Sequence, residues 1–187
     1  MSRIAGSDAE VAIHDLRRRF VPLLSTVAAI LLALLPIVAA APLLPDFGFL
    51  VLITWRLLRP EIWTPRMALG LGLVADLVAG NPLGQSMLLW TSAFLAFDLI
   101  DSRLGFRDYW MDWLVASGAL ILHTVGAWYI ALLMGSDVRF AVIVPQMGLS
   151  ILAYPVAARL VLGLDRWRMT RCGGARLPSL PKARTRR

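Results

Sequence analysis

Long apolar blocks separated by short polar connections dominate this sequence. Hydrophobic residues make up 58% of the 187 positions, and charged residues make up only 17%. The blocks define six candidate membrane spans, at residues 20–41, 43–58, 67–81, 83–100, 111–134 and 138–163. A helix needs about 20 residues to cross the ~30 Å hydrocarbon core of a bilayer, so the second and third candidates are short for a full crossing. The pattern predicts an all-α fold, a polytopic bundle of six transmembrane helices.

Basic residues divide the chain into two flanks and a membrane domain. Arginines cluster before the first span, where three are consecutive at 17–19, and again after the last span. We therefore expect a basic segment at 1–19, a six-helix membrane domain at 20–163 and a basic tail at 164–187. The tail contains glycine and proline but few residues that pack, so we expect it to be disordered and attracted to anionic membrane lipids.

The arginines between the spans also predict how the helices are oriented. Arg56, Arg59 and Arg66 follow the second span, and Arg103 and Arg107 follow the fourth, whereas the turns after the first and third spans carry no basic residue. Because basic loops stay on the cytoplasmic side, we expect these two loops and both termini in the cytoplasm. Arg56, Arg59, Arg103 and Arg107 are therefore candidate contacts for cytoplasmic partners. This topology also explains the net charge of +7, so we do not expect nucleic-acid binding.

Asp76 is the strongest functional candidate, because it is a carboxylate inside an otherwise apolar run. A charge at the centre of the hydrocarbon layer costs roughly 2.5 to 3.5 kcal/mol, so it needs a partner, a proton or a cavity. On a helix, Gly72, Asp76 and Gly80 share one face, which allows a neighbouring helix to approach closely. Pro82 and Gly84 follow in a cluster of helix breakers that forces a tight turn. These five residues form a candidate intramembrane interaction element.

Two interpretations of Asp76 stay open from the sequence. A protonated Asp76 can hydrogen-bond across the bundle as structural glue, or the side chain can bind a ligand or relay protons. Its candidate polar partners within the bundle are Gln85, His123 and Gln146. Two histidines without a cysteine cluster or a suitable carboxylate spacing cannot supply a metal site, and we expect neither a metal nor another cofactor. No catalytic triad, phosphate loop or carboxylate pair is recognisable, so we do not expect an enzyme.

Several segments together resemble the MreD family of rod shape-determining proteins. The most specific one runs from Gly72 to Gly84, where Asp76-Leu77 precedes Gly80-Asn81-Pro82-Leu83-Gly84. Weaker matches occur in the order expected for the family: Trp55-Arg56-Leu57-Leu58-Arg59-Pro60 after the second span, and Pro145-Gln146 and Tyr154-Pro155 in the last. With the length and the topology, the resemblance covers most of the chain.

The resemblance implies a non-enzymatic scaffold or regulator of peptidoglycan synthesis in the cell-elongation complex of a bacterial inner membrane. The implied partners are MreC, actin-like MreB, the RodA glycosyltransferase and a class B penicillin-binding protein, besides membrane lipids. The family is also similar in fold to the substrate-binding membrane subunits of energy-coupling-factor vitamin transporters. The alternative function is therefore a small-molecule-binding subunit of such a transporter, for which the external loops look too short to cap a vitamin.

Overall fold

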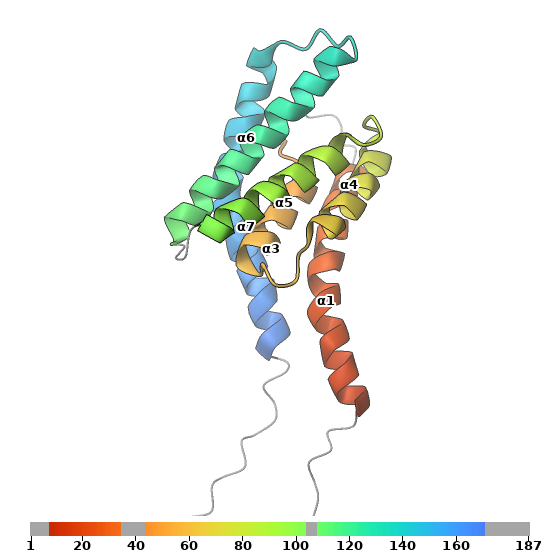
Figure 1. The fold of residues 1–187 in the computed structure, drawn as a ribbon, viewed down its shortest axis with the longest axis vertical. Helices are drawn as coiled ribbons and strands as arrows, with labels where there is room; N and C mark the ends of the chain where they lie inside the picture. The colour runs from red at the N-terminus through yellow and green to blue at the C-terminus, as the bar shows by residue number, and fades with distance from the viewer. Residues whose placement is uncertain (1–7, 35–43, 104–107, 171–187) are drawn as a thin grey trace, which may run out of the picture.

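A computed structural model describes residues 8–34, 44–103 and 108–170 of the chain. All the regular elements within these ranges are helices: α1 (Asp8–Leu31), the 3-10 helix η1 (Leu32–Leu34), α3 (Phe47–Leu58), α4 (Pro65–Ala79), α5 (Gln85–Arg103), α6 (Tyr109–Leu133) and α7 (Phe140–Thr170) (Figure 1). The predicted all-α class is confirmed, and one α-helix overlaps each expected span.

The helices differ in how far they can reach across a bilayer. Among the described residues, two helices are long and apolar enough to cross on length and composition alone: α6, and α7 over Phe140–Trp167. The apolar helices at Phe20–Leu34 and Phe47–Leu58 are shorter. With 12 residues in α3 and 15 in α4, the second and third helices do fall short of a full crossing. These lengths and compositions are compatible with a helical membrane protein.

Two helix boundaries differ from the predicted ones. α1 begins at Asp8 instead of near residue 20, and α7 continues to Thr170 instead of ending at 163. Packing explains the extension of α7, because Asp165 is buried and accepts a hydrogen bond from Arg59 at 2.8 Å. Residues 164–170 of the expected tail are therefore helical, and the remaining tail lies outside the described residues.

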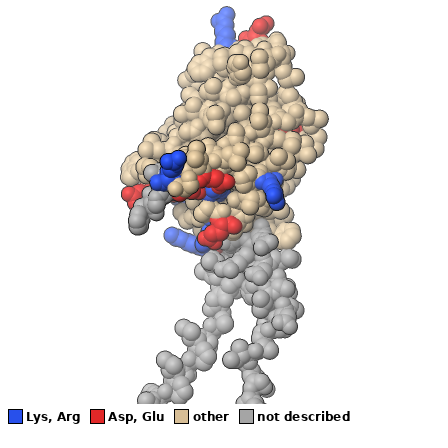
Figure 2. Space-filling view, viewed as in Figure 1, with Lys and Arg blue, Asp and Glu red and all other residues tan. Residues whose placement is uncertain are grey.

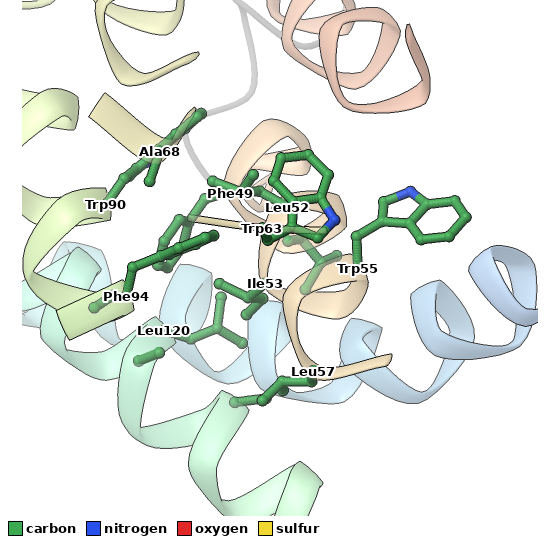
Figure 3. Close-up of a cluster of buried hydrophobic side chains, with 14 of the residues drawn as sticks. Phe49, Leu52, Ile53, Trp55, Leu57, Trp63, Ala68, Trp90, Phe94 and Leu120 are labelled. Atoms are coloured by element: carbon green, nitrogen blue, oxygen red, sulfur yellow. The ribbon is translucent and has the colours of Figure 1, made fainter. Parts of the chain in front are cut away.

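α3 is the central helix of the bundle (Figure 1) and packs against α1, α6 and α7. Nine of its 12 residues are buried, on all sides of the helix, as expected for a helix that is apolar all round. Figure 3 shows Phe49, Leu52 and Ile53 of α3 in one cluster with Trp90 and Phe94 of α5. Close packing of these aromatic and aliphatic side chains forms the centre of the helix bundle.

α4 packs mainly on α5 through a single buried face. The buried residues recur at helical spacing and are Ala68, Leu71, Gly72, Ala75 and Asp76. Gly72 is a point of very close approach, because a Cβ placed there would lie 2.7 Å from the backbone N and Cα of Met87 in α5. The absence of a side chain at Gly72 therefore sets the distance between the two helices.

Charged side chains gather toward one end of the described body. Figure 2 shows a broad surface without charged side chains, a band of mixed charge toward that end and charged groups at the opposite end. The band lies near the carboxyl ends of α3 and α5 in Figure 1, whereas the opposite end is the α6–α7 turn, which contains Asp137 and Arg139. The described body thus has an uncharged middle region between two ends that carry charged side chains.

The close approach at Gly72 leads to a first prediction. Gly72→Ala should destabilise the protein by about 1 to 3 kcal/mol, because the new Cβ collides with the α5 backbone. Gly70 is a matched control in the same helix, since a Cβ there meets nothing within 4 Å and Ala favours the helix. Thermal melting in detergent should show a lower Tm for Gly72→Ala and an unchanged or higher Tm for Gly70→Ala. Equal Tm values would contradict the close contact.

Candidate functional site

Asp76 closes the turn that joins α4 to α5. α4 ends at Gly80, which has φ +69°, and the Asp76 carbonyl accepts the N–H of Gly80 and that of Asn81. The carboxylate reaches forward along the chain: Oδ2 accepts the N–H of Gly84 at 2.9 Å, and Oδ1 accepts that of Ser86 at 2.8 Å. The residue is only 1% exposed. Asp76 therefore satisfies backbone groups at the end of one helix and at the start of the next.

These contacts show how the protein accommodates the carboxylate. Both oxygens act as acceptors and both meet backbone N–H groups around the N-terminus of α5, where the helix dipole favours negative charge. Among the described residues, the hydrogen bonds of Asp76 go to backbone groups and not to Gln85, His123 or Gln146. Backbone partners carry no signal in the amino-acid sequence, which is why side chains were expected instead.

The glycines of the predicted interaction element have different tasks. Gly72 permits the close helix contact, whereas a Cβ at Gly80 or at Gly84 would meet nothing within 4 Å. These two glycines instead adopt left-handed backbone conformations, with φ +69° and +97°, that side chains other than glycine rarely tolerate. Pro82 is exposed between them. The element is thus one helical hairpin. Gly72 allows its helices to pack closely, Asp76 caps the helix ends, and Gly80 and Gly84 form the turn.

Gln85, His123 and Gln146, the expected partners of Asp76, line two adjoining cavities instead. The smaller cavity has a volume of about 210 Å³ and the larger about 270 Å³. Both are lined by Asp46, His123 and Gln146, and Gln85 lines the larger one. The sequence pattern therefore identified polar residues that share one region of the bundle, but it connected them to the wrong carboxylate.

Asp46 is the carboxylate at these cavities, and sequence analysis did not single it out. It is the N-cap of α3, where Oδ1 accepts the N–H of Phe49 at 3.1 Å, and its Oδ2 lies 3.1 Å from Nε2 of His123. The His123 ring stacks on Phe49 with 4.4 Å between centroids. Gln146 donates from Nε2 to the carbonyl of Leu44 at 3.0 Å. An aspartate directly before an apolar block is a helix N-cap signal and would have indicated Asp46.

The arginines at the carboxyl end of α3, Arg56 and Arg59, form ion pairs with two other helices. Arg56 is buried, and its Nη2 donates to Asp98 at 2.5 Å and to Asp101 at 3.0 Å, both in α5. Arg59 donates to Asp165 of α7 at 2.8 Å. This hydrogen bond raises the pKa of the Arg59 guanidinium, although burial acts in the opposite direction. The carboxyl end of α3 is thus tied to α5 and to α7 by charged groups.

The four arginines predicted to contact cytoplasmic partners therefore have different surroundings. Arg56 and Arg59 already have partners within the protein. Arg103 is exposed in the last turn of α5 and is free of such a bond among the described contacts. Arg107 lies outside the described residues. Within the described part of the chain, Arg103 is the arginine of this group best placed to meet another protein.

The capping role of Asp76 gives a second prediction. Asp76→Leu leaves two buried N–H groups without acceptors, at about 1 to 3 kcal/mol each, so unfolding in detergent should require clearly less heat or denaturant. Asp76→Asn retains one acceptor oxygen but turns an amide donor toward the other N–H, so its stability should be intermediate. Asp137→Leu, at an exposed aspartate, serves as the control. Wild-type stability of Asp76→Leu would refute the capping role.

Comparison with known proteins identifies the family of this chain. The family model described as rod shape-determining protein MreD matches residues 16–164. The match includes the α4–α5 hairpin, both cavities and the pairs of Arg56 with Asp98 and Asp101. No curated protein and no solved structure gives a match. Because the matched range is most of the 187-residue sequence, the chain belongs to the MreD family of rod shape-determining proteins.

Proposed function

We propose that this protein is a non-enzymatic scaffold or regulator of the cell-elongation complex in the bacterial inner membrane. It controls cell shape and peptidoglycan synthesis through contacts with MreC and with the associated synthases, RodA and a class B penicillin-binding protein. The observation that carries this proposal is the match of residues 16–164 to the MreD family. That family has a role in rod shape determination together with MreC and MreB, and its members are integral inner-membrane proteins.

The α4–α5 hairpin is the proposed intramembrane contact element. Its inner face is occupied, because Gly72 and Asp76 pack against α5. The outer face of α4 exposes Leu73 and Leu77, and the hairpin tip exposes Leu83 at 72%. We place the membrane anchor of MreC against this outer surface. Asp76 then supports partner binding indirectly, by holding the hairpin in one shape.

A multi-pass topology with both termini in the cytoplasm is part of the same proposal. The beginning of α1 and the end of α7 point toward the same end of the molecule in Figure 1. That is also the end with the band of mixed charge in Figure 2. Since basic residues favour the cytoplasmic side, this arrangement supports an orientation in which the turn after α4 and the α6–α7 turn face outward.

A second candidate function is a small-molecule-binding subunit of an energy-coupling-factor transporter. The two cavities near Asp46 and His123 are the observation in its favour, because a transporter subunit needs an internal site for its substrate. The two candidates differ in their partners. A transporter subunit associates with an ATP-binding module, whereas a scaffold of the elongation complex associates with MreC.

Copurification from native membranes tests the proposed function. The tagged full-length protein should retain MreC, and then the synthases, above the level in an untagged strain when retained proteins are identified by mass spectrometry. Asp76→Leu should retain less MreC at equal expression, because the hairpin loses its cap. Recovery of an ATP-binding transport module without MreC would replace the scaffold with the transporter function.

Reporter fusions test the topology. Green fluorescent protein fused after Arg187 should be fluorescent, because the C-terminus is proposed to be cytoplasmic. Alkaline phosphatase inserted after Ser136, in the α6–α7 turn, should be active, because this enzyme folds only outside the cytoplasm. An active phosphatase after Arg187, with an inactive insertion at Ser136, would reverse the proposed orientation.

A further inference from the structure

The two cavities have the composition of a ligand site in a helix bundle. Their walls are mostly apolar, with a few polar side chains from the N-cap of α3, from α6 and α7 and, in the larger cavity, from the α4–α5 turn and α5. This is the usual pattern of small-molecule sites. Volumes of about 210 and 270 Å³ are slightly below the ~300 Å³ at which typical ligand pockets begin. The chemical group recognised in either cavity is therefore small.

The charge of the lining restricts the class of ligand. Asp46 lines both cavities, and among the described lining residues there is neither lysine nor arginine. A phosphate or carboxylate ligand would therefore meet an acidic side chain, and the nearest basic side chain, His123, already contacts that carboxylate at 3.1 Å. A carboxylate in an apolar body is stabilised by an opposite charge, so the lining favours a cation.

The hydrogen-bonding groups restrict the class further. His123 Nδ1 is buried and has no hydrogen-bond partner. This nitrogen is inaccessible from the cavities, so His123 contributes to them by holding Oδ2 of Asp46 through Nε2 at 3.1 Å. Gln146 donates from Nε2 to Leu44, which leaves its Oε1 as another acceptor beside the same cavities. The acceptors shared by both cavities are therefore the oxygens of Asp46 and Gln146, and the side-chain amides of Asn81 and Gln85 add donors in the larger cavity.

Aromatic side chains complete the pattern. Trp128 lines the smaller cavity and Phe47 lines the larger one. The faces of such rings attract cations, and together with a carboxylate they are a recurrent combination in the recognition of ammonium groups. A primary ammonium group carries three N–H donors and one positive charge, which matches the carboxylate of Asp46 and the amide oxygen of Gln146.

We propose that the cavities around Asp46, His123 and Gln146 bind a primary ammonium group, carried either by a small free amine or by the headgroup of an aminophospholipid. This site goes beyond the scaffold function and does not depend on it. In the lipid case only the ammonium group enters, because the cavity lining offers no base to the adjoining phosphate.

Binding by the purified full-length protein tests the proposal. Ethanolamine is the free-amine probe, and ethylene glycol is its control of similar size without a charge. Nanodiscs of phosphatidylethanolamine with phosphatidylglycerol, compared with phosphatidylglycerol alone, provide the lipid probe, with retained lipid measured by native mass spectrometry. Calorimetric binding of ethanolamine but not of ethylene glycol supports a free amine, and selective retention of phosphatidylethanolamine supports the headgroup. Binding of neither ammonium probe overturns the proposal.

A conservative variant separates binding from folding. Asp46→Asn removes the charge but keeps a residue that caps helices well, so α3 should still form. It should weaken ammonium binding roughly tenfold or more, as expected for loss of a charge-assisted hydrogen bond. Asp108→Asn, at the N-cap of α6, is the matched control and should bind like the wild type. Unchanged ethanolamine binding by a folded Asp46→Asn variant would overturn the proposed site. If this variant does not fold, the comparison of ethanolamine with ethylene glycol on the wild-type protein still tests the proposal.

Discussion

The bundle depends on the way Asp76 satisfies the backbone at the α4–α5 turn. Its carbonyl meets the N–H groups of Gly80 and Asn81, and its carboxylate meets those of Gly84 and Ser86. Irregular backbone at membrane depth is tolerated only when the protein itself provides hydrogen-bond partners. Because one residue provides partners on both sides of the turn, α5 can reverse direction at once and pack closely on α4. The contact then orients the aromatic side chains of α5 toward the central helix.

The central helix α3 is short and is held in place at both ends by polar groups. With 12 residues it spans only about 18 Å, whereas α6 and α7 on its flank have 25 and 31 residues. At its N-terminus Asp46 meets His123, and at its carboxyl end Arg56 and Arg59 meet aspartates of α5 and α7. Apolar contacts between helices change little when one helix shifts along its axis. The polar contacts at the two ends of α3 therefore fix its position along that axis. The cavities lie at the N-terminal end of this short helix, beside its longer neighbours.

The fold class and the approximate helix positions follow from the apolar blocks, because helices are the local solution for such segments in lipid. The end of α7 depended on information from elsewhere in the chain, because the extended part contains Asp165, which pairs with Arg59. Asp76 was recognisable because a carboxylate is costly in its surroundings, yet its partners were not, since they are backbone groups. Arg56 was expected at a surface, but its partner Asp98 is 42 residues away and only the fold brings them together.

The aspartates at two helix ends, Asp76 and Asp46, differ in how completely the polar groups around them are satisfied, and this difference separates a structural role from a binding role. At Asp76 both oxygens have backbone donors, so the cost of the carboxylate is offset within the protein and its role is structural. At Asp46 the neighbouring His123 keeps an unpartnered buried nitrogen, and the adjoining space is not filled by the described side chains. Helix capping alone requires neither the histidine nor the cavity, because aspartate accepts the backbone N–H by itself. The polar groups beside Asp46 are therefore explained better by a ligand bound in the adjoining cavities than by a need to stabilise α3.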